Sequence, residues 1–325
     1  MRLEIVPLEE KHLQDAAGLA SARYRALREQ VPPMPARYAE PDIILPWLQD
    51  LASHAPGVAA IRNGRLTGFL VGMVIPQFRG KRGIYSPEWA NAASSGDSQC
   101  IYEEMYARLS ARWVADGCVA HVISILAHDR SGIEGWTGLG FGLAAADGIR
   151  AVDSEHTLEP GSNPSSEIEI RRAGPDDAEQ MRELIAALHR YLMAAPTFLF
   201  RSETEKVDRH AAWLADPANA LWLAYQGTSA VACMGQGPAN PDACDIISDD
   251  KTTSITSAFT QPSARDGGIA TALLNRVLDW SRKEGFERCA VDWEPMNILG
   301  NRFWTRHFQT VCCALIRHID ERMCE

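Results

Sequence analysis

The spacing of apolar residues predicts a helix after residue 268 and a strand behind it. Apolar or small side chains recur there at i, i+3, i+4 and i+7, at Leu274, Val277, Leu278 and Ser281. Gly285 follows this run, in the place where a left-handed glycine commonly ends a helix. The stretch from Cys289 to Glu294 then predicts a strand, and Asn297 opens a second helix.

The same order of elements is predicted twice along the chain. The first half reads as a strand at 3–6, a helix, a hairpin at 57–75 across Asn63-Gly64, a helix at 100–116 and a strand at 119–126. The second half reads as a strand from 167, helices at 175–193 and 203–214, a hairpin at 220–235 and a strand at 252–260. This repetition predicts two copies of one fold.

Glycines and tryptophans give the register between the two copies. Gly117 precedes Trp136 by the same interval as Gly285 precedes Trp304. On that register Asp129 is aligned with Asn297, and Gly132 with Gly300. We therefore expect a first domain at 1–150, a linker at 151–166 that is rich in proline and glycine, and a second domain at 167–325. The length of the chain suits two domains, each with its own core.

The loop before the helix at 269 has the composition of an anion site. Arg265, Asp266, Gly267 and Gly268 stand directly in front of Ile269. Glycine lets a backbone approach a ligand closely, and the first amides of a helix lack internal acceptors. Together with the helix dipole and the arginine, these amides predict a phosphate site. The alternative is an ordinary strand-to-helix turn that contains two glycines.

Two motifs at a fixed separation favour the phosphate site. Arg265, Gly268 and Ala270 match the pattern Arg/Gln-x-x-Gly-x-Gly/Ala, with Pro262 upstream of it. Asn297, Gly300, Phe303 and Trp304 lie where a second pattern has Asn-x-x-Ala-x-x-Phe-Tyr. Across about residues 167–325 the chain thus resembles the GCN5-related N-acetyltransferases. The resemblance implies a mixed α/β fold in two tandem domains, each a mostly antiparallel twisted sheet flanked by helices.

The resemblance also implies acetyl-CoA as the cosubstrate. Backbone groups near Phe259 and Thr260 would pair with the pantetheine arm and polarise the acetyl carbonyl, and Asn297 would reach the same arm, although it is equally well explained as a helix N-cap. The residues that the resemblance assigns to the cofactor are Phe259, Thr260, Arg265, Asp266, Gly267, Gly268, Ile269, Ala270, Thr271, Asn297, Phe303 and Trp304.

The catalytic residues are less clearly indicated. Asp292 and Glu294 alternate onto one face of the predicted strand and are candidates for the general base, with solvated carboxylates as the alternative. Trp304 stands where the family often has a tyrosine that protonates the leaving thiolate, and an indole is only a weak donor. The interpretation of Trp304 as a core residue packed on the cofactor side is therefore favoured over a role in acid catalysis, with Tyr225 or His307 as candidates to replace the missing phenol.

The first copy departs from the family at the phosphate loop. On the repeat register Asp97 is aligned with Arg265, and Cys100 with Gly268. An acidic residue in place of the cation, without a glycine, makes this copy a poor CoA site. We therefore expect a degenerate N-terminal half and a CoA-binding C-terminal half.

Composition excludes several other classes of protein. A net charge of −10 argues against a nucleic-acid partner, because phosphate binding needs a basic surface. There is no apolar run near the roughly 20 residues of a membrane span and no signal-peptide pattern, so we expect a cytoplasmic protein without a membrane partner. The 8 cysteines contain no Cys-x-x-Cys pair and favour reduced, buried thiols, without a metal site.

The expected function is an N-acetyltransferase that acts on a small-molecule amine by direct transfer in a ternary complex. The rival is a non-catalytic acyl-CoA-binding or interaction protein, which Trp304 and the unassigned base favour. A purely structural use of the fold would require the Arg265 motif to be a coincidence. Because tandem copies can supply contacts that other proteins obtain by dimerising, we expect a monomer.

Overall fold

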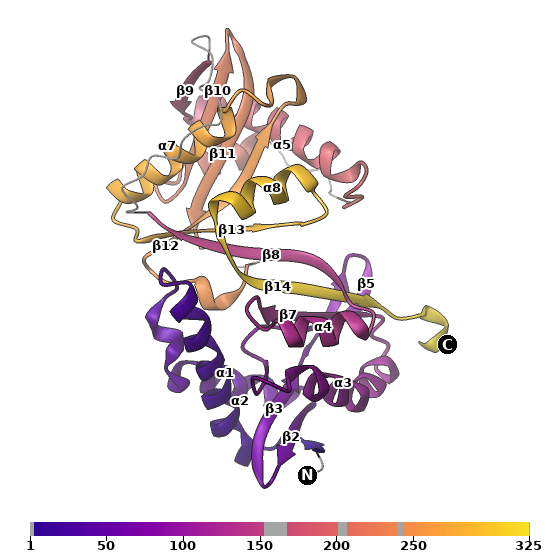
Figure 1. The fold of residues 1–325 in the computed structure, drawn as a ribbon. Coiled ribbons are helices and arrows are strands. Elements are labelled where there is room, and N and C mark those ends of the chain that lie inside the picture. The colour runs from indigo at the N-terminus through magenta and orange to yellow at the C-terminus, as the bar shows by residue number, and fades with distance from the viewer. Residues whose placement is uncertain (1–2, 153–167, 201–206, 240–242, 325) are drawn as a thin grey trace. The chain divides into compact units, whose positions relative to one another are not determined.

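The computed structural model describes residues 3–152, 168–200, 207–239 and 243–324 (Figure 1). Most of the linker expected at 151–166 lies outside these residues. The chain divides into two compact units. Unit 1 contains Met1–Gly148, Cys244–Ile246 and Gln309–Glu325, and unit 2 contains Ile149–Ala243 and Ile247–Phe308.

Unit 1 contains two sheets and four α-helices among its described residues. Its elements are β1 (Glu4–Pro7), α1 (Glu10–Gln30), α2 (Pro41–His54), β2 (Gly57–Arg62), β3 (Arg65–Val71), β4 (Met73–Phe78), β5 (Lys81–Ser86), β6 (Asn91–Ala93), α3 (Ser98–Ala115), β7 (Ala120–Leu126), α4 (Arg130–Gly138), most of β8 (Gly142–Ala151) and β14 (Gln309–His318). The first sheet has the order β1-β2-β3-β6, and the second begins β4-β5-β7-β14-β8.

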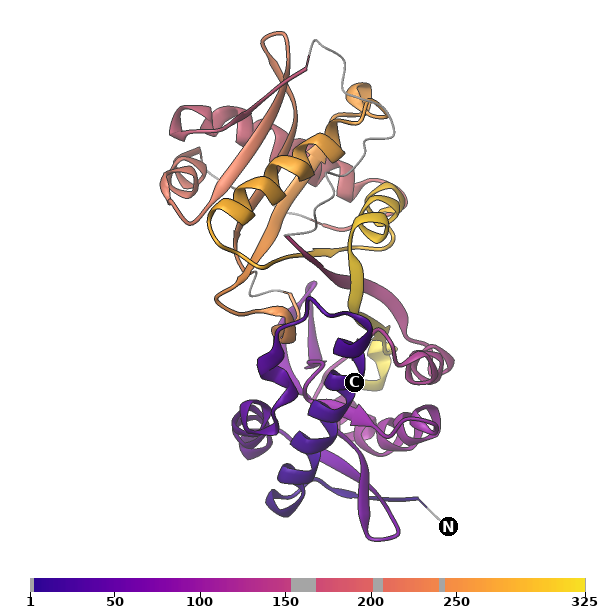
Figure 2. The same cartoon turned by 60° about the vertical axis from the view of Figure 1, so that its left-hand side comes forward.

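The helices of unit 1 cover the two faces of β3 (Figures 1 and 2). Phe69 and Val71 pack with the buried faces of α1 and α2. Leu70 points the other way and packs with α3, whose buried side chains include the predicted apolar stripe of Met105, Leu109 and Trp113. This alternation is what a strand buried on both faces requires.

The hairpin predicted at 57–75 forms, but it is interrupted. Asn63 and Gly64 both have positive φ, at 55° and 73°, as a two-residue hairpin turn demands. At Gly72 the chain leaves β3 and begins β4, which belongs to the other sheet. A Cβ at Gly72 would lie 2.7 Å from a side-chain carbon of Ile84. The close approach of β5 at this point explains why the strand breaks at a glycine.

Strand β14 follows all the elements of unit 2 in sequence and yet belongs to unit 1. It pairs antiparallel with β7, from Cys312 opposite Leu126 to His318 opposite Ala120. Leu315 of β14 lies in the same hydrophobic cluster as Ile123 of β7. The domain expected at 167–325 therefore differs at this end from the compact unit, because the last strand completes the sheet that contains β7.

Among its described residues, unit 2 contains five consecutive strands of the second sheet, packed between helices. Its elements are β9 (Ile168–Arg172), α5 (Ala178–Met193), α6 (Val207–Ala215), β10 (Ala220–Gln226), β11 (Ser229–Pro238), β12 (Thr252–Thr260), α7 (Ile269–Lys283), β13 (Arg288–Trp293) and α8 (Ile298–His307). The strand order is β13-β12-β11-β10-β9, and only β12 and β13 of these pairs are parallel. The mixed, mostly antiparallel sheet expected from the sequence is confirmed.

Helices α5 and α7 cover opposite faces of this sheet (Figure 1). The predicted stripe of α7 is buried, at Leu274, Val277, Leu278 and Ser281. Gly285 has a φ of 84°, the left-handed conformation expected after this helix. Leu221 and Leu223 of β10 lie in the cluster that contains the buried side chains of α5.

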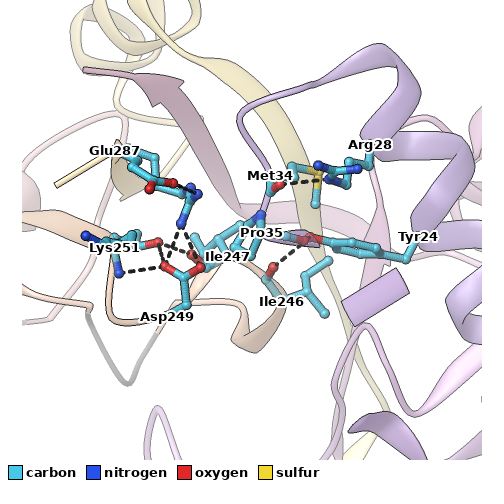
Figure 3. Close-up of polar contacts among 11 residues, drawn as sticks. Tyr24, Arg28, Met34, Pro35, Ile246, Ile247, Asp249, Lys251 and Glu287 are labelled. Atoms are coloured by element: carbon cyan, nitrogen blue, oxygen red, sulfur yellow. Dashed lines mark hydrogen bonds and ion pairs between the residues drawn. The ribbon is translucent and has the colours of Figure 1, made fainter. Parts of the chain in front are cut away.

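The segment 246–249, which precedes β12, is held by polar contacts at each of its ends (Figure 3). Within unit 1, the Tyr24 hydroxyl donates to the carbonyl oxygens of Pro35, at 2.5 Å, and Ile246, at 3.3 Å. Within unit 2, Arg288 donates to both carboxylate oxygens of Asp249, at 2.6 and 2.7 Å. These contacts fix the backbone that leads into β12.

Among the helices of the described residues, none has the length and apolar character of a membrane span.

Leu315→Ala tests the assignment of β14 to unit 1. Leu315 is 1% exposed, so its truncation should cost about 2–5 kcal/mol of stability. Hydrogen exchange followed by mass spectrometry should show faster exchange in α3 and β7. In the control Leu274→Ala, which removes an equally buried leucine of unit 2, the faster exchange should lie in β10, β11 and α7. Faster exchange of α7 in Leu315→Ala, with α3 and β7 unchanged, would contradict the assignment.

Candidate functional site

The sheet of unit 2 opens between its two parallel strands. Pairing of β12 with β13 runs from Thr252 opposite Arg288 to Ile255 opposite Val291 and ends there. The remainder of β12 continues to Thr260 and pairs only with β11. Backbone groups of Ala258–Thr260 that face away from β11 therefore have no strand partner in the part of the chain that the structure describes. This edge offers hydrogen-bonding groups to an extended ligand.

The loop after β12 brings the N-terminus of α7 to this opening. Gly268 is the N-cap of α7 and has a φ of 73°, and Asp266 also has a positive φ, of 64°. The left-handed region favours glycine, which explains Gly268. The first N–H groups of α7, at Ile269, Ala270 and Thr271, follow this turn and have no acceptor within the helix.

A pocket of about 480 Å³ lies at the opening and collects most of the predicted cofactor residues. It is lined by Phe259, Thr260, Arg265, Asp266, Gly268, Ile269, Ala270, Thr271, Asn297, Phe303 and Trp304. Gly267 is absent from the lining, and a Cβ there would meet nothing within 4 Å. The pocket has the size of a typical ligand site.

Arg265 lies against aromatic rings inside the pocket. Its Nε donates to the carbonyl oxygen of Thr260 at 3.1 Å, and its guanidinium carbon is 4.6 Å from the ring centre of Tyr191 and 6.0 Å from that of Phe259. Arg306 of α8 also lines the pocket. Two arginines and a helix N-terminus make this region attractive to anions.

Asn297 caps α8 and also lines the pocket. Its Oδ1 accepts from the Gly300 N–H at 3.2 Å, which caps α8, and the side chain lines the pocket. A Cβ at Gly300 would lie 2.6 Å from the Asn297 amide nitrogen, so a larger residue there would require the Asn297 side chain to shift. The first half repeats this arrangement: Asp129 caps α4 by accepting from the Gly132 N–H at 3.0 Å. The aligned pairs therefore have the same local geometry.

Tyr191 is a pocket residue that the sequence analysis missed. It lies on α5, and its hydroxyl donates to Asn297 Oδ1 at 3.4 Å. Its ring is 6.2 Å from that of Phe259. In the sequence, Tyr191 belongs to an amphipathic helix, where an aromatic residue normally indicates packing. Only the three-dimensional structure shows that its hydroxyl reaches the site.

Trp304 and Phe303 form the wall of the pocket on α8. Trp304 is buried, and its ring packs against Phe303 at 4.8 Å and Phe308 at 5.6 Å. The interpretation of Trp304 as a packed residue on the cofactor side fits this position. His307 lies outside the lining; burial, and then Arg150 and Arg306, lower the pKa of His307 to about 4. Its imidazole is thus neutral at pH 7 and is not positioned as the acid.

Tyr225 is held outside the pocket by an ion-pair network. Its hydroxyl donates to Asp177 Oδ1 at 3.2 Å and accepts from Arg171 at 2.8 Å. Arg171 in turn binds both oxygens of Asp177, at 2.6 and 2.9 Å. Burial, followed by the Asp177 carboxylate, raises the pKa of the Tyr225 phenol. The structure gives Tyr225 a place in this network and no position beside the pocket lining.

The two carboxylates considered as bases also lie outside the lining. Asp292 is exposed on β13, and Glu294 follows the end of the strand, half-buried. Strand β13 ends at Trp293, one residue before the strand end expected from the sequence. The structure therefore does not bring either carboxylate together with the predicted cofactor residues.

Cys233 is the cysteine among the described residues that line the pocket. It lies on β11 opposite Phe259 and is 1% exposed. Burial raises the pKa of Cys233 to about 12. At neutral pH it is a protonated thiol, and a thiol is a poor nucleophile.

The aligned region of unit 1 is filled by an ion pair. Arg23 of α1 binds Asp129 at 3.0 Å, and their side chains are only 13% and 5% exposed. Ser98 also donates to Asp129, at 2.7 Å. The cavity beside these residues measures about 10 Å³, which is room for about one water molecule. Arg23 and Asp129 thus close the space that is open beside Asn297 in unit 2.

A family model and solved structures both relate this chain to the same group of acetyltransferases. Residues 185–308 match the family model described as the acetyltransferase (GNAT) family. The comparison with curated proteins found no match.

Two solved structures share the fold of the chain. A GCN5-related N-acetyltransferase from Sphaerobacter thermophilus superposes with a TM-score of 0.60 at 14% identity, covering 97% of this chain and 95% of that one. A GCN5-related glucosamine N-acetyltransferase region of a fungal multi-domain β-N-acetylglucosaminidase superposes with a TM-score of 0.52 at 12% identity, covering 97% of this chain and 38% of that one. We conclude that the chain carries a domain of the acetyltransferase (GNAT) family at residues 185–308 and has the fold of that family.

Proposed function

We propose that this protein transfers the acetyl group of acetyl-CoA to the amine of a small molecule. The observation that carries the proposal is the pocket of unit 2, where an unpaired strand edge, the N-terminus of α7 and Arg265 meet. A ligand with an extended amide-bearing arm and a diphosphate requires these three features next to one another. The match of residues 185–308 to the acetyltransferase family supports this ligand.

The pocket residues divide between the parts of the cofactor. The N–H groups of Ile269–Thr271 and the guanidinium of Arg265 would hold the diphosphate, and Arg306 is a second cation for its phosphates. The free backbone edge of Ala258–Thr260 would pair with the amides of the pantetheine arm. In this arrangement Arg265 would leave its contact with the Tyr191 ring and turn toward the diphosphate.

Direct transfer is the mechanism that suits these residues. The amine nitrogen attacks the acetyl carbon, an N–C bond forms, and the C–S bond breaks to release the CoA thiolate. The amine loses one proton and the thiolate gains one. Cys233 is unsuited to a covalent intermediate, because the raised pKa keeps it protonated. A ternary complex of cosubstrate and amine therefore requires fewer unfavourable steps than a two-step transfer.

Tyr191 is our candidate for the acid that protonates the leaving thiolate. It is the tyrosine among the described residues that line the pocket, and its hydroxyl would turn from Asn297 Oδ1 to the leaving sulfur. A phenol has the pKa range needed to donate to a thiolate, whereas the Trp304 indole donates only a weak hydrogen bond. Tyr191 would thus supply from α5 the function that Trp304 on α8 lacks.

The proton of the amine would pass to water in this mechanism. Asp266 is the carboxylate among the described lining residues, and it lies in the loop at the N-terminus of α7, away from the acetyl end. Glu294 would act as a base only through intervening water. We therefore assign no side chain as an obligatory base, and an amine with a low pKa is the preferred kind of acceptor.

We further propose that the N-terminal half is a degenerate copy of the same domain. The two halves have the same order of elements, except that β4, β5 and β6 precede α3 where β12 alone precedes α7, and they have the same cap geometry at Asp129 and Asn297. The Arg23–Asp129 ion pair occupies the space that a pantetheine arm would need. One acetyl-CoA per chain is therefore expected.

The alternative is a non-catalytic acyl-CoA-binding protein. Trp304 and the absence of a carboxylate at the acetyl end of the described lining favour it. Release of free CoA thiol with a panel of amines, including amino sugars because of the glucosamine neighbour, separates the two. Binding of acetyl-CoA without thiol release on any amine would favour the binder.

Arg265→Ala should weaken the binding of acetyl-CoA. The variant loses the guanidinium beside the N-terminus of α7, and a charge-assisted contact of this kind contributes about 1.5–3 kcal/mol, or roughly a tenfold to hundredfold change in affinity. Calorimetric titration should show one site in the wild type and weaker binding in the variant. The matched control is Arg276→Ala, an exposed arginine of the same helix outside the pocket, which should bind as the wild type does.

Gly268→Ala tests the geometry of the loop. A side chain in the left-handed region costs about 1–2 kcal/mol, so the loop should shift and acetyl-CoA affinity should fall. Gly267→Ala is the control, because its Cβ would enter open space. Equal loss of affinity in both variants would contradict the role given to Gly268.

Tyr191→Phe should lower kcat while leaving the KM for acetyl-CoA nearly unchanged. Loss of one proton donor typically costs about 10²–10⁴-fold in rate. Tyr225→Phe, which removes the phenol first considered for this role, should retain kcat. A Tyr191→Phe variant with full activity would show that the hydroxyl has no part in the chemistry.

A further inference from the structure

A second group of reactive side chains lies in unit 1 and has no part in the proposed transfer. Asp147 of β8, Cys244 and Cys312 of β14 are all buried. A carboxylate oxygen and the two sulfur atoms all lie within 4.8 Å of one another. The three residues are far apart in sequence, so the fold alone brings them together.

The distances suit a tetrahedral metal ion. Zinc binds sulfur at about 2.3 Å and carboxylate oxygen at about 2.0–2.2 Å, which places neighbouring ligand atoms roughly 3.5–4 Å apart. The three atoms therefore need to move by little to meet at one ion. Two thiolates with one carboxylate are a set that zinc accepts, whereas magnesium and calcium prefer oxygen alone.

Glu88 is a further buried carboxyl group in this part of unit 1. Its side chain is 3% exposed, and Oε2 has no hydrogen-bond partner among the described residues, while Oε1 accepts from the Ile246 N–H at 3.1 Å. An unsatisfied buried carboxylate oxygen is costly. The charges that act on Glu88 are those of the carboxylates of Asp245 and Asp147. Glu88 also acts electrostatically on both Cys244 and Cys312, so it lies near the cluster.

The segment that carries Cys244 is held rigidly in unit 1. The Cys244 N–H donates to Asp147 at 3.1 Å, and Trp89 Nε1 donates to Asp245 at 2.7 Å. The Tyr24 hydroxyl donates to the carbonyl oxygen of Ile246 (Figure 3). These contacts position the Cys244 thiol in advance, as a structural metal site requires.

We propose that Asp147, Cys244 and Cys312 bind one Zn²⁺ ion in unit 1, near the buried carboxyl group of Glu88. Binding releases the two thiol protons to solvent, and the ion balances the negative charge of the two thiolates. The ion joins three segments that are distant in the sequence and so stabilises unit 1. This site is independent of the proposed acetyl transfer, because its ligands do not line the pocket of unit 2.

Metal content and cobalt spectroscopy of the full chain test this proposal. The chain is purified under reducing conditions without chelator, and its zinc is measured by mass spectrometry. After removal of the metal, Co²⁺ is titrated into the chain and the near-ultraviolet band of thiolate-to-cobalt charge transfer is recorded. We expect about one ion per chain and a band that saturates at one equivalent.

Variants of the ligands give the specific readout. Cys312→Ser and Cys244→Ser should each reduce the band and weaken Co²⁺ binding by more than tenfold, and Glu88→Gln should weaken it by about 10–100-fold. The control is Cys118→Ser, a buried cysteine of unit 1 outside the cluster, which should keep the full band. Circular dichroism reports whether each variant is folded, and the wild-type titration does not depend on any variant.

Three results would overturn the proposal. The first is a wild-type chain that retains no zinc and gives no cobalt band at stoichiometric metal. The second is a band that persists in both cysteine variants, since it would come from another thiol such as the exposed Cys100. The third is a thiol count in which Cys244 and Cys312 are joined in a disulfide.

Discussion

The constraint on which the site depends is that a buried backbone group needs a hydrogen-bond partner. In unit 2 the ladder between β12 and β13 ends at Ile255 and Val291, and β12 continues for several residues with one edge unpaired. Such an edge is stable only if solvent or a ligand reaches it. The pocket at this edge therefore meets a structural need, and the ligand that fills it best is one with its own amides.

The same constraint explains the difference between the two halves. In unit 1 the aligned space beside Asp129 is occupied by Arg23, whose charge is compensated by the carboxylate. A buried ion pair satisfies its own polar atoms and leaves nothing for a ligand. In unit 2 the aligned residue is the neutral Asn297, which cannot hold a buried arginine and instead accepts from Tyr191. The acid at 129 thus accompanies a filled region in unit 1, and the amide at 297 accompanies the open pocket of unit 2.

Local features of the fold could be predicted from the sequence, and features that depend on distant contacts could not. The face of α7, the turn at Gly285 and the caps at Asp129 and Asn297 follow from short-range patterns. The pocket residues from Phe259 to Thr271 were predicted because one continuous motif contains them. Tyr191, on a separate helix, carries no such signal. Tyr225 was considered from its residue type alone, and its partners Arg171 and Asp177 could not be foreseen. Asp147, Cys244 and Cys312 are far apart in the sequence, so no short motif could have predicted their cluster.

The position of β14 has a consequence for the order of folding. The ribosome synthesises β7 well before β14, with all of unit 2 between them. Until β14 emerges, β7 has an unpaired edge that is rich in buried apolar residues, and such an edge invites pairing with another chain. The strands of unit 2, from β9 to β13, are all synthesised before β14. The N-terminal half is synthesised first and therefore finishes folding last. A chaperone that protects nascent chains would be needed longest by this half.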